Sequence, residues 1–224
     1  EDLEITIPAD RNLTPVAVVS FYDDAATGSI EIIKTDTVDG RALAGATFDI
    51  RADGDIVRTD DSIVALDGET VATVTTDERG HARVDHLSLG CGTATYEVVE
   101  TQAPEGYLLN PTPHTVKLSY ADQQTPVIEV HLDVSNDYTK IDVSKVDACG
   151  GQEVTGAELV LCDSNGNEID SWTSSGKPHH IEHLSPGTYT LRETMSPRTY
   201  DLAEEITFEV KATGEVQTVA MKDT

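Results

Sequence analysis

The sequence predicts an all-β chain built from a tandem repeat. Short runs rich in Val, Ile, Thr and Tyr alternate with clusters of Gly, Pro, Asn and Asp along the whole chain. No long stretch keeps the apolar period of an amphipathic helix. Three segments also recur in the same order in the two halves of the chain, which indicates that one folding unit is present twice.

The repeated unit contains a first predicted strand, a second predicted strand and, further along, a segment that contains the dipeptide Glu-Thr. The matching pairs are GSIEIIKTD with TKIDVSKVD (28–36 and 139–147), LAGATFDI with VTGAELVL (43–50 and 154–161), and YEVVETQAPEGY with YTLRETMSPRTY (96–107 and 189–200). The first copy is longer, mostly because of extra residues within 53–80. We expect these extra residues to lengthen a hairpin or loop at one end of the first unit.

The repeat predicts two complete domains and part of a third. Residues 4–24 resemble residues 205–224, which form the closing hairpin of the second unit. The expected divisions are the last strands of a truncated upstream unit plus a linker (1–27), a first complete domain (28–137) and a second complete domain (138–224). The junction DYTK (137–140) is short, which favours a stiff string of domains.

Composition excludes several classes of partner. The 224 residues contain 15 Lys and Arg against 41 Asp and Glu, a net charge of −26, so nucleic acid and anionic membranes are poor partners. The fragment has no apolar run long enough to span a membrane and no signal-peptide pattern. Its cysteines, Cys91, Cys149 and Cys162, lack the paired spacing of a zinc site. Neither a metal nor a cofactor is therefore expected.

Polar side chains fall on the apolar face of several predicted strands. Side chains alternate between the two faces of a strand, so Lys34 shares a face with Ile30 and Ile32, and Glu100 shares one with Tyr96 and Val98. The closing strands and the second unit repeat this pattern. Each unit thus directs a Lys, a Glu and an Asn or Asp into one core: Lys34, Glu100 and Asn136 in the first, and Lys145, Glu193 and Asp223 in the second.

Two interpretations of these buried groups remain open from the residues alone. They can form a structural salt-bridge cluster, because buried charges are normally paired and hydrogen-bonded. They can also react, because burial lowers the pKa of Lys and raises the pKa of Glu. A neutral amine then attacks the side-chain carbonyl carbon while a protonated Glu moves protons. The product is an amide, with loss of ammonia from Asn136 or water from Asp223.

These segments resemble the Cna B-type, SpaA-like pilin domains of Gram-positive surface proteins. The resemblance rests on a lysine strand ending KTD or KVD, a following GA strand, a YxxxETxAPxGY box and a closing strand ending in Asn or Asp, and it covers essentially the whole chain. It implies tandem immunoglobulin-like, prealbumin-like β-sandwiches with self-formed isopeptide bonds. The implied bonds are Lys34 to Asn136 with Glu100 catalytic, and Lys145 to Asp223 with Glu193 catalytic.

The second box departs from the family pattern. Ser196 and Thr199 stand where the first box has Ala103 and Gly106, and threonine reaches some turn conformations less easily than glycine. In the truncated upstream unit, Asp23 shares a face with apolar neighbours. The resemblance therefore implies that Asp23 is an orphaned acceptor without its lysine and glutamate.

The resemblance implies a structural role at the bacterial cell wall. The units would be extracellular spacer modules of a pilin shaft or adhesin stalk, with neighbouring domains of the same chain as partners, and one intramolecular turnover is not enzyme catalysis. The alternative is an adhesin domain that binds a host protein or glycan through the loops of the first domain. Only 5% of residues are aromatic and none lies within 53–80, which disfavours a hot-spot patch. No GxSxG or HExxH motif supports a hydrolase.

Three other motifs favour ordinary structural explanations. In HHIEH, His179 and His180 would point to opposite faces of a strand, which disfavours a metal site. DSNGNE (163–168) predicts a hairpin turn rather than a calcium loop, because Glu168 stands where such a loop needs glycine. Cys162 falls on the outward face of its predicted strand, which disfavours a disulfide bond with Cys149.

Overall fold

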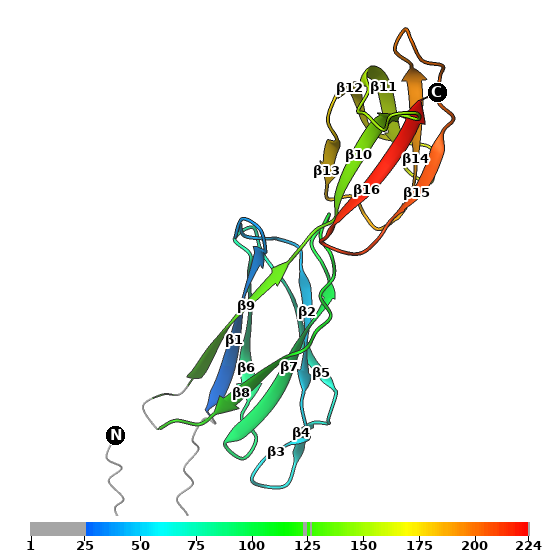
Figure 1. Ribbon diagram of the computed structural model, residues 1–224. Coiled ribbons are helices and arrows are strands. Elements are labelled where there is room, and N and C mark those ends of the chain that lie inside the picture. Colours follow the sequence, from blue (N-terminus) through cyan, green and yellow to red (C-terminus); the bar gives the residue numbers. More distant parts are fainter. Residues whose placement is uncertain (1–25, 123–124, 126, 224) are drawn as a thin grey trace, which may run out of the picture.

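The computed structural model describes residues 26–122, 125 and 127–223, which form two β-sandwiches placed end to end (Figure 1). The first sandwich contains β1 (Thr27–Asp36), β2 (Thr47–Ala52), β3 (Ile56–Val57), β4 (Ile63–Ala65), β5 (Thr70–Thr75), β6 (His81–Ser88), β7 (Thr93–Gln102), β8 (His114–Ser119) and β9 (Val127–Asn136). The second contains β10 (Lys140–Asp147), β11 (Thr155–Cys162), β12 (Glu168–Ser175), β13 (His179–Glu182), β14 (Gly187–Met195), β15 (Ile206–Val210) and β16 (Val216–Asp223). The prediction of an all-β chain is confirmed.

Each sandwich pairs a three-stranded sheet with a four-stranded sheet. The first has the strand orders β6-β1-β9 and β5-β2-β7-β8, and the second has β13-β10-β16 and β12-β11-β14-β15. The first and last strands of each sandwich, β1 with β9 and β10 with β16, lie side by side and run parallel. The chain therefore enters and leaves each sandwich through neighbouring strands of its three-stranded sheet.

Alternating apolar residues build a separate core in each sandwich. Ile30 and Ile32 of β1, with Phe48 and Ile50 of β2, are completely buried in the first core, while Glu31 and Asp49, which lie between them, are less buried. The second core is built in the same way around residues such as Leu161 of β11. The alternation of side chains that the sequence predicts thus decides which residues face inward.

The extra residues of the first unit form a hairpin. The short strands β3 and β4 pair antiparallel with each other and stand outside the two main sheets. The following strand, β5, pairs with β2 in the same way that β12 pairs with β11. Only the β3–β4 hairpin is therefore additional, and β5 is a regular strand of the sandwich.

Cys162 differs from the expectation. Its side chain is 5% exposed, although alternation from Leu161 would turn it outward. The pairing of β11 with β12 shifts register between Leu161 and Cys162, and such a bulge redirects side chains. Cys91 and Cys149 are exposed, and all three cysteines are free thiols.

The hairpin turn predicted for DSNGNE is confirmed. In DSNGNE, Gly166 has a φ of +83° and donates its amide to the carbonyl of Asp163, as in a hairpin turn. In the two boxes, Tyr107 N donates to Pro104 O at 3.1 Å and the corresponding bond of the second box measures 2.9 Å. Gly106 has a φ of +79° in the first of these turns. Thr199 closes the second without a positive φ, so the substitution preserves the turn.

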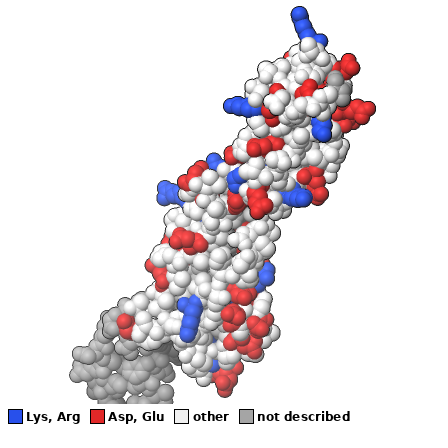
Figure 2. Space-filling view, in the orientation of Figure 1, with Lys and Arg blue, Asp and Glu red and all other residues white. Residues whose placement is uncertain are grey.

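The surface is strongly acidic. Figure 2 shows Asp and Glu scattered over both sandwiches, with Lys and Arg standing mostly singly between them. In the part of the chain that the structure describes, no helix has the length and apolar character needed to cross a lipid bilayer. Within the same residues, no three metal-ligating side chains come together as a metal site.

Candidate functional site

The first sandwich brings its three predicted polar residues together inside its core. Lys34 of β1, Glu100 of β7 and Asn136 of β9 are each at most 1% exposed. In the parallel β1–β9 pairing, Lys34 lies opposite Val134, and Asn136 is two residues further along. Since side chains two residues apart share a face, Asn136 is a diagonal neighbour of Lys34 on the core side of the sheet.

Hydrogen bonds orient the amide of Asn136 toward Glu100. Asn136 Nδ2 donates to Glu100 Oε1 at 2.8 Å and to Oε2 at 3.0 Å. Lys34 Nζ donates to the main-chain carbonyl of Val134 at 3.3 Å. Asn136 Oδ1 is buried and has no hydrogen-bond partner. The carbonyl oxygen of the amide is thus free to accept a proton or a hydrogen bond.

The second sandwich repeats the arrangement with an acid in place of the amide. Lys145 of β10, Glu193 of β14 and Asp223 of β16 are 1%, 3% and 0% exposed. Lys145 lies opposite Met221, so Asp223 is again two residues beyond the register partner of the lysine. Lys145 Nζ forms an ion pair with Asp223 Oδ1 and lies 3.3 Å from Glu193 Oε2. All three predicted residues are therefore in contact.

Burial shifts the protonation of the first cluster toward neutral groups. Desolvation lowers the pKa of Lys34 from 10.5 to about 8, against the opposing effects of Glu100 and Asp36. Desolvation also raises the pKa of Glu100, and this outweighs the lowering effects of its hydrogen-bond donors and of Lys34. Both shifts favour a neutral amine beside a carboxylic acid. Such a pair has the components for nucleophilic attack on a carbonyl carbon with proton transfer by the acid.

Comparison with known proteins identifies the family. The family model described as "SpaA: Prealbumin-like fold domain" matches residues 28–133 and residues 139–224, which together are most of the chain. The chain belongs to this SpaA family. The resemblance to SpaA-like domains and the prediction of tandem prealbumin-like sandwiches are thereby confirmed.

Individual relatives of these SpaA domains come from Gram-positive bacteria. Serine-aspartate repeat-containing protein F of Staphylococcus epidermidis is 30% identical over 137 residues, or 55% of this chain, and the chain spans 8% of that protein's length. Among solved structures, the Bacillus anthracis TIE protein has a TM-score of 0.47 and 24% identity, covering 88% of this chain and 34% of that one. The shaft pilin SpaA of Lactobacillus rhamnosus GG has a TM-score of 0.40 and 17% identity, covering 88% and 98%.

Each SpaA domain also uses a main-chain group that the sequence did not reveal. The amide of Asn110 donates to Glu100 Oε2 at 2.8 Å, and the amide of Ala203 donates to Glu193 Oε2 at 2.6 Å. Each donor lies ten residues after its glutamate. A main-chain amide can donate this hydrogen bond whatever side chain its residue carries. The residue types at these two positions therefore give no indication of the contact in the sequence.

The two SpaA domains differ beside the glutamate. His114 is opposite Val98 in the β7–β8 pairing, and its charge lowers the pKa of Glu100. The equivalent position in the second domain is Ile206, opposite Leu191 of β14. The sequence did not single out His114, because its position at the start of β8 matches no motif. The first site therefore has an additional titratable neighbour that the second lacks.

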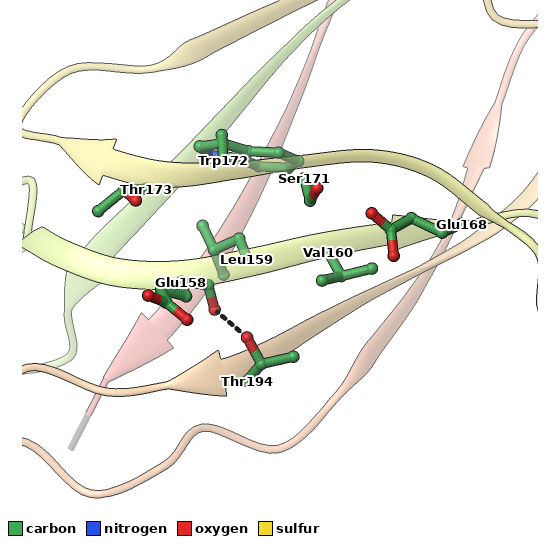
Figure 3. Close-up of a pocket in the computed structure, with 8 residues that line it drawn as sticks. All are labelled: Glu158, Leu159, Val160, Glu168, Ser171, Trp172, Thr173 and Thr194. Atoms are coloured by element: carbon green, nitrogen blue, oxygen red, sulfur yellow. Dashed lines mark hydrogen bonds between the residues drawn. The ribbon is translucent and has the colours of Figure 1, made fainter.

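The remaining candidates lie apart from these sites. Asp23, the predicted orphan acceptor, is outside the described residues. His179 contacts Asp170 and His180 contacts Asp142, on separate sides of β13. A hollow of about 340 Å³ lies over β11 and β12, where Trp172 and Glu158 line it (Figure 3). It is open to solvent and holds no cluster of reactive groups.

Proposed function

We propose that the chain forms two stalk modules of a Gram-positive cell-wall surface protein, each sealed by an isopeptide bond. The proposed bonds join Lys34 to Asn136 and Lys145 to Asp223. The observation that carries the proposal is the recurrence of one diagonal arrangement, lysine and acceptor beside a buried glutamate, in both cores. A structural ion-pair cluster would not require the same two-residue offset twice.

In the first module, the neutral amine of Lys34 attacks Cγ of Asn136. Glu100, in its acid form, donates a proton as the carbon–nitrogen bond to Nδ2 breaks, and it accepts a proton from the attacking Nζ. The products are one amide bond and one ammonia, and Glu100 ends as it began. Desolvation raises the pKa of Glu100 and so favours its neutral acid form, which is the form able to donate a proton.

In the second module, the acceptor is a carboxylic acid. Transfer of the ion-pair proton from Lys145 to Asp223 leaves a neutral amine beside a carboxylic acid. Nζ then attacks Cγ of Asp223, and the carbon–oxygen bond to the protonated carboxyl oxygen breaks. Glu193 transfers the protons, and the products are one amide bond and one water. Each bond forms once per chain, so the reaction is self-modification and not enzyme catalysis.

The position of the bonds suits a stalk. Each bond would tie the first strand of a sandwich to the last, β1 to β9 and β10 to β16, which are the strands that tension on the chain ends would pull apart. A covalent tie replaces a marginal free energy with a bond that tension and proteases do not open by unfolding. We place the module boundaries at 28–137 and 138–224, outside the cell at the wall surface.

Intact mass spectrometry of the purified, folded chain tests the proposal. We expect a deficit of one ammonia plus one water relative to the sequence. Glu100→Ala should restore the ammonia and Glu193→Ala the water. The controls Glu97→Ala on β7 and Glu209→Ala on β15 change carboxylates outside the two clusters and should keep both deficits. A folded wild-type chain of full mass would overturn the proposal.

A second candidate function is ligand binding by the β3–β4 hairpin. Ile63 and Leu66 are 60% and 52% exposed, and Val71 of the neighbouring strand is 37% exposed. A hollow of about 430 Å³ lies between β4, β5 and β6, and the exposed Val64 and Val71 line it. Exposed apolar side chains around a hollow favour recognition of a host protein or glycan through this end of the first module.

The structure indicates where to cut the hairpin. Ala52 exchanges main-chain hydrogen bonds with Gly68 and Glu69, so residues 54–67 can be replaced by an Asn-Gly turn without removing β5. Immobilised extracellular-matrix proteins and a glycan array serve as probes. Loss of binding in this variant, and in a double variant with Ile63→Ser and Leu66→Ser, would support the hypothesis that the hairpin binds a ligand. Unchanged binding, or none by the wild type, would contradict it.

A further inference from the structure

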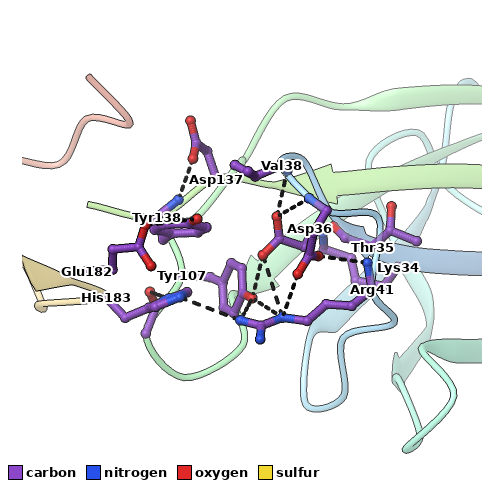
Figure 4. A network of polar contacts seen from close by, with 12 residues as sticks. Lys34, Thr35, Asp36, Val38, Arg41, Tyr107, Asp137, Tyr138, Glu182 and His183 are labelled. Carbon is purple, nitrogen blue, oxygen red and sulfur yellow. Dashed lines mark hydrogen bonds and ion pairs between the residues drawn. The ribbon is translucent and has the colours of Figure 1, made fainter. Parts of the chain in front are cut away.

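An aromatic cluster joins the two sandwiches. Tyr107 comes from the box loop after β7, Tyr138 from the connection between β9 and β10, and His183 from the residue after β13 (Figure 4). The rings of Tyr138 and His183 stack with centroids 3.9 Å apart. Tyr107 meets both edge-on, at 5.9 Å and 5.1 Å. The cluster therefore spans the junction and contains one ring from each side of it.

Main-chain hydrogen bonds hold the cluster on both sides of the connection. Leu108 N donates to Asp137 O at 2.8 Å, and His183 N donates to Thr139 O at 3.1 Å. His183 also has a φ of +62°, a conformation that residues other than glycine seldom adopt. The ring of His183 is thus fixed toward the first sandwich by the local backbone.

A polar chain runs through the same cluster. Tyr107 OH donates to Asp36 Oδ2 at 2.7 Å and accepts from Arg41 Nη2 at 2.6 Å. Arg41 Nη2 is also 3.5 Å from His183 Nε2. On its other side, His183 Nδ1 lies 3.1 Å from the carbonyl oxygen of Gly106. The first sandwich therefore contacts both ring nitrogens of a histidine that belongs to the second.

These contacts require a neutral imidazole. A carbonyl oxygen only accepts, so Nδ1 must carry the hydrogen that bonds to Gly106. A guanidinium only donates, so Nε2 must offer its lone pair to Arg41. Protonation of His183 fills that lone pair, removes the acceptor and sets two cations against each other at 3.5 Å.

The other charged groups around the ring are engaged elsewhere. They are Asp36 from β1, Asp137 from the connection, Lys140 from β10 and Glu182 from β13. Lys140 Nζ pairs with Asp137 Oδ1 at 2.6 Å, so these two charges offset each other. Asp36 binds Tyr107 OH and the turn amide of Val38, and its Oδ2 lies 3.7 Å from Arg41 Nε, so it offsets part of the guanidinium charge.

Glu182 is the acid next to His183 in sequence. Its Oε1 accepts from Tyr138 OH at 3.4 Å and lies 3.3 Å from His180 Nε2. No carboxylate contact to the ring of His183 occurs among the described residues, whereas Arg41 contacts it directly. The guanidinium is therefore the charge that His183 would meet on protonation.

We propose that this cluster is a proton-sensitive lock that fixes the second sandwich on the first while His183 is neutral and releases it when His183 is protonated. The lock is independent of the isopeptide bonds, because those lie inside each core. A stalk with this junction is stiff at neutral pH and more flexible in acid.

The second sandwich offers a matched control. At its far end, Tyr200 OH donates to Asp147 Oδ2 at 3.1 Å, as Tyr107 does to Asp36. Asp147 N bonds to Gln152 O as Asp36 N bonds to Arg41 O, so Gln152 occupies the position of Arg41. Changes at Tyr200 thus alter an equivalent contact that is not part of the junction.

Double electron–electron resonance, which measures the distance between two spin labels, tests the proposal on the full chain. Cys91 and Cys149 are exposed, one in each sandwich, and accept spin labels, while Cys162 is buried. The width of the distance distribution is compared at about pH 8 and about pH 5, which brackets the titration of an ordinary histidine. The variants are Arg41→Gln, His183→Asn and, as control, Tyr200→Phe. Asparagine is chosen because it tolerates a positive φ and does not titrate.

We expect a narrow distribution at about pH 8 that broadens and shifts at about pH 5 in the wild type and in Tyr200→Phe. Arg41→Gln removes the opposing cation, so its distributions should agree at both pH values, and so should those of His183→Asn. Circular dichroism at both pH values verifies that the sandwiches stay folded. A wild-type width that does not change with pH, whether narrow or broad, would overturn the proposal. So would an unaltered pH response in His183→Asn.

Discussion

Asn136 presents its amide nitrogen, and not its amide oxygen, to the carboxyl group of Glu100. Both Glu100 oxygens lie within 3.0 Å of Nδ2. In the proposed reaction, Nδ2 is the atom that leaves as ammonia, so it already contacts the group that supplies its proton. In the second sandwich, Lys145 contacts both the acceptor and the glutamate. The two sites thus differ in their leaving group and in which side chains touch, but share the two-residue offset between lysine and acceptor beside a buried glutamate.

This shared geometry predicts that the acceptors can be exchanged. In Asn136→Asp, the first bond should still form, with loss of water in place of ammonia, and in Asp223→Asn the second should form with loss of ammonia. Either acceptor yields the same amide, so every crosslinked combination should have the intact mass of the crosslinked wild type, one ammonia or one water per site below the mass of its own sequence. Asn136→Ala, which has no electrophilic carbon, is the control and should show only the deficit of the second site. A folded Asn136→Asp chain without the loss of water at the first site would show that bond formation there requires the side-chain amide of Asn136.

Removing the first crosslink should destabilise the first sandwich. The bond would close a loop of about 100 residues, for which the loop-entropy estimate is about 4 to 5 kcal/mol. Lys34→Met removes the bond while keeping an unbranched apolar chain in the core, so it avoids leaving an unpaired buried charge. Urea unfolding of this variant should show a loss of about 4 kcal/mol. Lys117→Met on the exposed side of β8 is the control and should change little. Equal stability of both variants would contradict a crosslink.

Gly80 should be required for the position of Lys34. Gly80 has a φ of +73°, its carbonyl accepts from Lys34 N at 2.8 Å, and a Cβ added to it would meet Lys34 O at 2.4 Å. Gly80→Ala should therefore destabilise the first sandwich and slow its bond formation. Gly68→Ala is a matched control, because its φ is +76° but no atom lies within 4 Å of the added Cβ. The control should lose only about 1 kcal/mol from its backbone. Equal losses would exclude the predicted clash.

The sequence was informative where alternation is regular. Lys34, Glu100 and Asn136 were predicted to face the core because each lies two residues from a buried apolar neighbour in an extended strand. The same reasoning misplaced Cys162, because a bulge in the β11–β12 pairing interrupts the alternation. Bulges depend on how two strands pair, and a single strand's pattern does not contain that information.

Contacts between distant segments were the other part that the sequence did not provide. The pattern HHIEH, which ends in His183, raises only the question of a metal site, yet His183 stacks on Tyr138 and contacts Arg41 across the junction. Its direction depends on a positive φ that no motif indicates. The box tyrosine, Tyr107, was recognised by its pattern, but its contact with Asp36 required the fold.

The lowered pKa of Lys34 predicts a pH-dependent stability that only an unlinked chain can show. In Asn136→Ala, the amine stays buried and titratable, with a pKa of about 8 when folded against 10.5 when unfolded. Between these values the unfolded chain binds more protons than the folded chain, so the free energy of unfolding rises with pH. Below about pH 8 the cost of burying the charged amine is fully present.

An amide nitrogen does not titrate in this range, so the linked wild type should lack this rise. Urea unfolding of both proteins from pH 8 to 10.5 should therefore show their stabilities converging as pH increases. Asn136→Ala combined with Lys34→Met removes the amine and serves as the control, whose stability relative to the wild type should not depend on pH. If Asn136→Ala and the wild type kept parallel curves, the same amine would be present in both, and the wild-type lysine would not be bonded.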